Sequence, residues 1–467
     1  MDNFFLLMQQ ELLITAIIFI LLFMKLSTKE WNPKQVLTIV NGLLFVNLAA
    51  GFFMRENGTL FGDMFQTNPL LRLEKNILSL GTFIISLQSY NWLLKHKHAL
   101  EFYLLMLSTL LGMFFMLSSS NLLMFYVGLE LASIPLASLA NFDLDKKRSS
   151  EAAMKYIMSS AFASGLLLFG ISMMYGIVGS VGFAELFAAV SDKPLFLFAF
   201  ILIIAGFGFK ISSVPFHLWT ADVYEGAPVA VTSYLSVISK GSMLFVMTSV
   251  LFTVFGKLLF QWYNILAVMA VLSMIVGNLF AIRQQNIKRF LAFSSISQVG
   301  FILIGITGAN AEGFSSVIYF VLVYLFSNLA AFAVINVVSE ASGKESIDDY
   351  KGFYKTNPVL TWVMAVALFS LAGIPPTAGF FGKFFLLLAG ASRANYLLII
   401  IAALNMVISL YYYLRIIKAM FMDANETPLA KVELNWSPKL AMVICVAGIV
   451  ITGIVSGAYE YIYSLVN

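Results

Sequence analysis

Apolar runs long enough to cross a lipid bilayer recur along the whole of this 467-residue chain. A membrane-spanning helix needs about 20 such residues, because each adds about 1.5 Å toward a hydrocarbon core about 30 Å thick. We count fourteen runs, at 5–25, 36–54, 77–94, 101–118, 121–141, 151–176, 195–219, 229–253, 261–281, 288–307, 313–338, 358–391, 395–421 and 439–460. The connections leave no room for a soluble domain. We therefore expect an all-α polytopic membrane protein with the bilayer as its surroundings.

The composition excludes several classes of function. Charged residues make up 11% of the chain, against about a quarter in a soluble domain, and 28 Lys and Arg nearly balance 24 Asp and Glu. Such sparse, balanced charge does not suit nucleic-acid binding. A single cysteine, Cys445, and three histidines are too few for iron–sulfur, zinc or haem ligation. We expect this chain to bind no cofactor and no metal.

The distribution of cations predicts the orientation in the membrane. Eighteen of the Lys and Arg residues, Lys288 among them, lie in connections that follow odd-numbered runs, and six, including Lys75, lie in the others. Because cytoplasmic loops carry the excess of cations, both termini are expected on the non-cytoplasmic side.

Five charged residues remain inside the apolar runs once the loops and run ends are set aside; Glu11 is among the acids within about a turn of a run end. The five are Glu130, Lys155, Lys210, Lys240 and Lys383. Each charge at mid-membrane costs roughly 2.5–3.5 kcal/mol on insertion scales. One interpretation is structural, with an ion pair and lysines that reach toward an interface; it suits Lys155, four residues after Glu151, best. The other is a proton relay, since burial weakens an amine's hold on its proton and a nearby carboxylate restores it.

Two of the runs contain helix-breaking residues close to a lysine. Pro215 follows Lys210 by five residues, and Pro375 and Pro376 lie with three glycines before Lys383. A proline kink can serve packing alone. Irregular backbone at membrane depth is tolerated where it is buried in protein or lines a wet cavity, so two broken helices beside buried charge favour transport.

The spacing of the breaks predicts an internal repeat. Residues 101–253 and 254–421 each hold five runs, and the fourth of each is broken. An odd number of spans places the second block upside down relative to the first. Helices 1–3 within residues 1–100 precede these two inverted repeats, and a last helix within 422–467 follows them.

Seven stretches resemble the antiporter-like membrane subunits of respiratory complex I, most closely the subunit N branch. They are LELASIP (129–135), EAAMKY (151–156), FKISSVPFHLW (209–219), DVYEGAP (222–228), NIKRFLAFSSIS (286–297), SLAGIPPTAGFFGK (370–383) and YYYLR (411–415). They cover the fourth to the thirteenth span in the family's order.

The resemblance assigns roles to the five charged residues. It implies that Glu130 and Lys210 form a carboxylate–lysine pair, with Lys240 as the central relay and Lys383 at the exit side. Lys155 matches a further buried lysine of the family. Many relatives carry a histidine where this chain has Gln298. Glutamine cannot be protonated at physiological pH, so we expect that link to run through water.

The resemblance also implies a setting. The complex is a proton-translocating NADH:quinone oxidoreductase of the bacterial plasma membrane, whose NADH, FMN, iron–sulfur clusters and quinone would be bound by other subunits. The expected partners are its other membrane subunits, especially the neighbouring antiporter-like ones. Three alternatives stay open: a subunit of a multi-subunit sodium/proton antiporter, a sodium-coupled variant of the complex, and a purely structural membrane scaffold.

Overall fold

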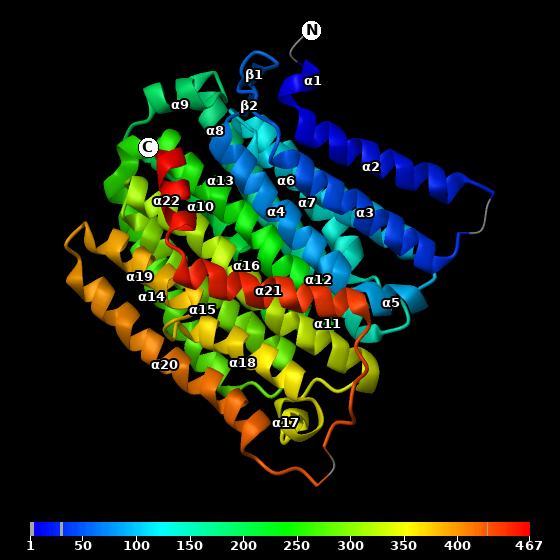
Figure 1. Ribbon diagram of the computed structural model, residues 1–467. Helices are drawn as coiled ribbons and strands as arrows, with labels where there is room; N and C mark the ends of the chain where they lie inside the picture. Colours follow the sequence, from blue (N-terminus) through cyan, green and yellow to red (C-terminus); the bar gives the residue numbers. More distant parts are fainter. Residues whose placement is uncertain (1–3, 29–30, 427) are drawn as a thin grey trace. The chain divides into compact units, whose positions relative to one another are not determined.

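The computed structural model describes residues 4–28, 31–426 and 428–467, and their regular secondary structure is helical apart from one small hairpin (Figure 1). The hairpin pairs β1 (Gly58–Leu60) with β2 (Phe65–Thr67) in antiparallel register. The helices before it and in the first half of the chain are α1 (Phe4–Leu7), α2 (Gln9–Leu26), α3 (Pro33–Gly51), α4 (Pro69–Gln88), α5 (Tyr90–Lys95), α6 (Ala99–Leu117), α7 (Leu122–Ala140), α8 (Lys147–Val178), α9 (Phe183–Ala189), α10 (Pro194–Ile211), α11 (Leu218–Gly226), α12 (Val229–Tyr234), the π-helical turn η1 (Leu235–Ser239) and α13 (Lys240–Thr253).

The second half continues in the same way. It consists of the 3₁₀ turn η2 (Gly256–Leu258), α14 (Leu259–Arg283), α15 (Ile287–Thr307), α16 (Ala311–Ser342), the 3₁₀ turn η3 (Ile347–Tyr350), α17 (Phe353–Thr356), α18 (Pro358–Ala372), α19 (Ala378–Ala391), α20 (Tyr396–Phe421), α21 (Trp436–Ile454) and α22 (Gly457–Val466). The prediction of an all-helical polytopic protein is therefore confirmed.

Within the described residues, twelve helical segments are long and apolar enough to cross a membrane. They coincide with twelve of the fourteen predicted spans. The run at 77–94 is represented by α4, which starts earlier and is more polar, and the run at 358–391 is divided into the two shorter helices α18 and α19. The count of fourteen is thus not confirmed as it stands.

The chain forms two compact units that alternate along the sequence. The first comprises residues 1–83, 92–211 and 239–262, and the second 84–91, 212–238 and 263–467. The segment after the break in α10 therefore belongs to the second unit, and the chain returns to the first at Ser239. Contiguous blocks with boundaries near 100, 253 and 421, and their inverted relationship, stay a prediction.

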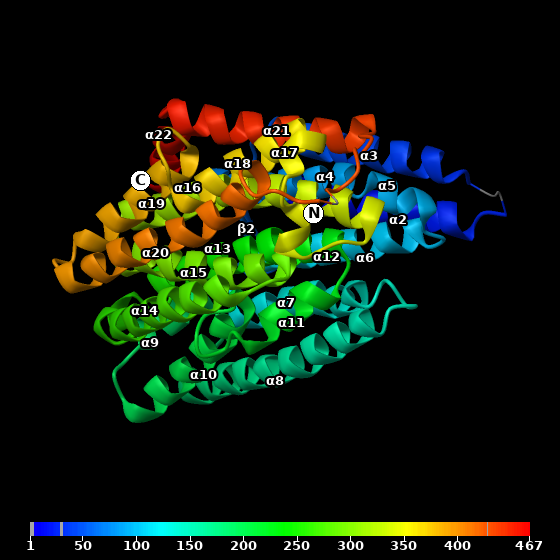
Figure 2. The ribbon, with the colours of Figure 1, turned by 90° about the horizontal axis from the view of Figure 1, so that it is seen from below.

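Small residues allow the helices of the first unit to pack closely. Side chains added at Gly112 of α6 or Gly128 of α7 would collide with the backbone of the other helix, at Ala132 and Met116 respectively. Such close approach is a common source of van der Waals attraction between membrane helices. Helices α8 and α10 lie side by side in the same unit (Figure 2).

Both predicted helix breaks are present. Helix α10 ends at Ile211 and α11 begins at Leu218, with Pro215 in the non-helical segment between them. The backbone N–H of Val214 donates to the hydroxyl of Ser273, 2.9 Å away. A side chain thus satisfies a backbone group that the break releases, as the bilayer requires.

The second break separates α18 from α19 at Pro375 and Pro376. Gly373 ends α18 with a φ of +87°, a left-handed conformation that favours glycine. At the other side, the backbone N–H of Gly379 donates to the Ser370 hydroxyl at 3.2 Å, which holds the start of α19 against the end of α18.

The first unit also contains a buried ion pair between Glu11, which we expected near the end of a run, and Lys75, which we expected in a connection. Lys75 of α4 and Glu11 of α2 are 1% and 2% exposed, and the amine lies 2.6 Å from the carboxylate Oε1. The Lys75 amine also lies over the rings of Phe65 and Phe114, 5.5 and 5.8 Å from their centroids. Lys75 is buried because α4 begins at Pro69 rather than at residue 77.

Replacement of Gly379 by alanine is expected to destabilise the protein, because the new Cβ would overlap the Ser370 carbonyl oxygen and force α18 and α19 apart. Overpacking of this kind typically costs about 1–3 kcal/mol. Gly165→Ala in α8, where nothing lies within 4 Å of the added Cβ, serves as the control. Thermal unfolding of the purified protein in detergent should show a lower midpoint for Gly379→Ala only; equal midpoints would contradict this account.

Replacement of Lys75 by methionine is expected to lower the free energy of unfolding by about 3–5 kcal/mol, because it leaves a buried carboxylate without its cation. Lys25→Met removes a pair of the same length, 2.6 Å to Glu101, in which Lys25 is 46% exposed, and should cost no more than about 1 kcal/mol. Detergent-mediated unfolding measures both losses. Similar losses for the two variants would show that burial of the Lys75 pair is unimportant.

Candidate functional site

Lys210 lies in the last turn of α10, immediately before the break, and is buried. Its amine donates to the hydroxyl of Ser133 on α7 at 2.7 Å and to that of Ser160 on α8 at 2.8 Å. Two neighbouring helices therefore hold the amine through uncharged oxygens.

Glu130 lies on the same helix as Ser133, three residues earlier, so the two side chains share one face of α7. The carboxylate is half-buried, its Oε1 has no hydrogen-bond partner, and it interacts electrostatically with the Lys210 amine. The structure thus brings the expected carboxylate and lysine into electrostatic contact. The hydrogen bonds of Lys210 nevertheless go to serines rather than to Glu130.

Lys155 does not join this group within the chain. It is 43% exposed, and its amine pairs at 2.8 Å with Glu151, one turn earlier on α8. The expectation that Lys155 is buried is wrong for this chain, because the residue lies on an outward face of a helix whose inward face carries Tyr156 and Ser160.

Lys240 is 2% exposed and is the first residue of α13. The π-helical turn η1 directly precedes it. A π turn adds a residue to the helical repeat and is frequent at functional sites. The buried position predicted for Lys240 is therefore observed, beside an irregularity that the sequence did not reveal.

Lys383 of α19 is fully buried, and its amine hydrogen-bonds to the end of α18 at the second helix break. The amine donates to the carbonyl oxygens of Leu371 and Ala372, at 2.8 and 3.2 Å. These carbonyls end α18, where the helix dipole is negative and stabilises a cation. The face of the Phe301 ring lies 4.9 Å from the amine and adds a cation–π contact.

Gln298 of α15 lies next to Lys383. Its Nε2 donates to the same Leu371 carbonyl at 3.0 Å and to the hydroxyl of Tyr413 at 3.1 Å. We expected a link through water at this position; the structure gives Gln298 a direct tyrosine partner.

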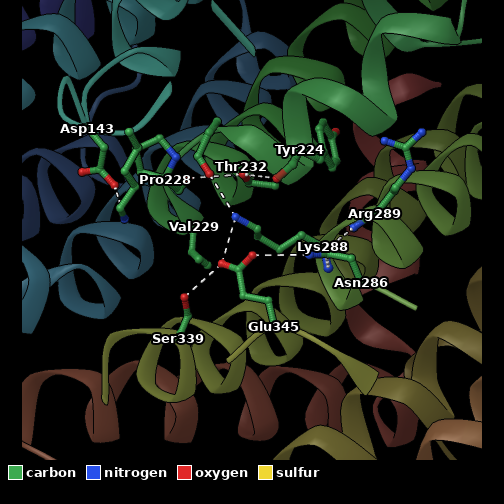
Figure 3. Close-up of polar contacts among 12 residues, drawn as sticks. Asp143, Tyr224, Pro228, Val229, Thr232, Asn286, Lys288, Arg289, Ser339 and Glu345 are labelled. Atoms are coloured by element: carbon green, nitrogen blue, oxygen red, sulfur yellow. Dashed lines mark hydrogen bonds and ion pairs between the residues drawn. The ribbon is translucent and has the colours of Figure 1, made fainter. Parts of the chain in front are cut away.

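A further buried lysine was missed by the sequence analysis. Lys288 is 4% exposed, and its amine lies 3.0 Å from the Glu345 carboxylate and 3.3 Å from the Ala227 carbonyl oxygen (Figure 3). The Ser339 hydroxyl also donates to Glu345. Asn286, the N-cap of α15, was the available signal, because it places Lys288 inside the helix rather than in a loop.

Arg289, the next residue, forms ion pairs with Asp222 and Glu225 of α11, at 2.6 and 3.0 Å. Two motifs that are distant in sequence, DVYEGAP and NIKRFLAFSSIS, are therefore joined in the second unit. Among the described residues, no group of three or more His, Cys, Asp or Glu side chains is arranged to hold a metal ion.

Comparison with known proteins agrees with this geometry. The model of the family described as NADH:quinone oxidoreductase/Mrp antiporter, transmembrane, matches residues 119–409. NADH-quinone oxidoreductase subunit N of Azobacteroides pseudotrichonymphae is 47% identical over 99% of this chain and 98% of its own length. The subunit N of Phocaeicola vulgatus is 45% identical over 97% of each chain.

A solved chain of respiratory complex I from Thermus thermophilus superposes with a TM-score of 0.82 at 27% identity, over 96% of this chain and 97% of that one. The family match over residues 119–409 spans both helix breaks and the buried lysines of this chain described above. The chain therefore belongs to the NADH:quinone oxidoreductase/Mrp antiporter family, in its subunit N branch.

Proposed function

We propose that this chain is a proton-translocating membrane subunit of an NADH:quinone oxidoreductase. The observation that carries the proposal is the way two buried amines are held: Lys210 by serine hydroxyls and Lys383 by backbone carbonyls. Uncharged partners orient an amine without fixing its positive charge. Such an amine can release its proton when the surrounding field changes.

Glu130 supplies that field for Lys210. While the carboxylate is charged, it favours the protonated amine, and when it moves away or takes up a proton, the amine gives its own proton up. The relay proposed here proceeds from Lys210 to Lys240 and on to Lys383, an order taken from the family resemblance. Lys155, exposed and paired with Glu151, stands outside it within this chain.

The two helix breaks also contribute to the proposed proton transfer. Each ends a helix beside a buried lysine, and each exposes backbone groups that water or side chains can contact at membrane depth. The proposal therefore assigns Pro215, Pro375 and Pro376 to the proton path rather than to packing alone.

The free energy comes from electron transfer in partner subunits, which on this proposal bind NADH, FMN, the iron–sulfur clusters and quinone. Transport of one proton against 100 mV requires about 2.3 kcal/mol. This chain acts as a translocase subunit without a redox centre of its own, in a bacterial plasma membrane with both termini on the non-cytoplasmic side. The excess of cations in the odd-numbered connections supports that orientation.

The family description also names Mrp antiporters, so a sodium/proton antiporter subunit is the alternative. Relatives that match over the whole chain at 47% and 45% identity are named as subunit N, which favours the oxidoreductase. Sodium tracer uptake in vesicles distinguishes the two: proton pumping driven by NADH without sodium movement supports our proposal.

Replacement of Lys210 or Lys383 by methionine in the assembled complex is expected to lower the number of protons pumped per electron, because the amine that carries the proton is lost. Inverted membrane vesicles allow proton uptake and NADH oxidation to be measured together. The control is Lys146→Met, which removes a lysine that is 70% exposed and pairs with Asp143. The control should pump normally.

Immunodetection of the subunit in the membrane separates failed assembly from failed pumping. An unchanged proton-to-electron ratio in Lys210→Met would end the role proposed for this residue. Normal pumping by Lys210→Met, Lys383→Met and Glu130→Gln together would instead support the structural scaffold.

A further inference from the structure

The buried hydroxyl of Tyr413 of α20 has hydrogen-bonding contacts with Gln298, Ser294 and Tyr412. The Nε2 of Gln298 donates to the tyrosine oxygen at 3.1 Å, and the tyrosine hydroxyl contacts the hydroxyl of Ser294. The same Nε2 donates to the Leu371 carbonyl at 3.0 Å. A carbonyl can only accept, so the Gln298 amide cannot be turned around. The Tyr413 oxygen accepts from Gln298, and in the contact between Tyr413 and Ser294 either hydroxyl can be the donor.

The amide of Gln298 ties this hydroxyl to Lys383. The Leu371 carbonyl oxygen accepts from the Lys383 amine at 2.8 Å and from Gln298 at 3.0 Å, which uses both of its lone pairs. The amine, the amide and the phenol therefore converge on the end of α18. All three side chains are buried, and Tyr413 is fully so.

A second line of buried hydroxyls starts one residue further along α15. Ser295 interacts with Tyr324 of α16, whose hydroxyl lies 3.2 Å from that of Ser236, and Asn328 donates to Ser236 at 2.7 Å. A core built only for packing does not need such groups, since each must be desolvated and matched. The polar interior of the second unit thus extends away from Lys383 along α15.

We propose that Tyr413 carries the proton next to Lys383 and that Gln298 is the residue that positions it. The inference rests on the proposed function, because it requires Lys383 to exchange protons. A proton from the Lys383 amine reaches the Tyr413 oxygen through a bridging water, forming an O–H bond, while the existing O–H bond breaks and its proton passes to the Ser294 oxygen. The Ser294 hydroxyl in turn releases its own proton to water, so the amine has lost one proton and both hydroxyls are unchanged. Tyr413 is neutral before and after the transfer.

This assignment explains how a glutamine at position 298 can contribute to proton transfer. An amide at position 298 cannot accept and release a proton, yet it can hold a hydroxyl that does. The ring of Tyr413 has a separate packing role, with its centroid 5.9 Å from Phe290 and 4.6 Å from Tyr412. Removal of the hydroxyl alone leaves those contacts in place, so the two roles can be tested apart.

The test compares Tyr413→Phe with Tyr319→Phe in the assembled complex in inverted vesicles. Tyr319 is another buried tyrosine of the second unit, and its hydroxyl donates to the Thr452 carbonyl oxygen at 2.7 Å, outside the Lys383 group. We expect a several-fold loss of protons pumped per electron for Tyr413→Phe, a larger solvent deuterium isotope effect on the residual pumping, and near-normal values for Tyr319→Phe.

A rescue variant separates proton transfer from structure. Gln298→His combined with Tyr413→Phe places a protonatable imidazole beside Lys383, and recovery of pumping supports the proposal. Normal pumping by Tyr413→Phe, an equal loss in Tyr319→Phe, or an assembled double variant without recovery would each overturn it. Normal pumping by Lys383→Met would contradict the proposed function itself. Loss of pumping in Lys383→Met together with normal pumping in Tyr413→Phe would contradict only the role proposed for Tyr413.

Discussion

The hydrogen bonds from the Lys383 amine to the carbonyls of Leu371 and Ala372 are the interaction on which the second half of the proposed pathway depends. A helix that ends inside a membrane leaves carbonyl groups without partners, and hydrocarbon offers none. The amine provides donors at that point. One contact therefore keeps α18 intact at its broken end and holds a titratable group deep in the protein.

A comparison with Glu11 and Lys75 shows why the choice of partner matters. In that pair the amine lies 2.6 Å from a buried carboxylate, and each charge stabilises the other, so loss of a proton would leave an unmatched charge. Lys210 and Lys383 are also buried, yet their hydrogen bonds go to hydroxyls and carbonyls. The first arrangement favours structural stability, and the second favours exchange.

Gln298 and Tyr413 extend the same principle. Neither side chain carries a charge, and both are buried. The Leu371 carbonyl, which can only accept, fixes the orientation of the Gln298 amide, and that amide donates to the Tyr413 hydroxyl. Proton transfer needs ordered donors and acceptors as well as titratable groups, and the end of α18 supplies that order for amine, amide and phenol together.

The sequence alone determined most of the helices and the burial of Lys210, Lys240 and Lys383, because spanning a bilayer imposes length and apolarity locally. It also determined both helix breaks, because Pro215 and Pro375 interrupt the hydrogen bonding of a helix interior. The tertiary structure decided where the other charges lie. Lys155 is on an outward face of α8, whereas Lys75 and Lys288 are buried although the sequence placed them in loops. Only packing determines which face of a helix meets protein and where α4 and α15 begin. The partners of Lys210, Lys383 and Gln298 come from residues 11 to 115 positions away, contacts that no local pattern of the sequence contains.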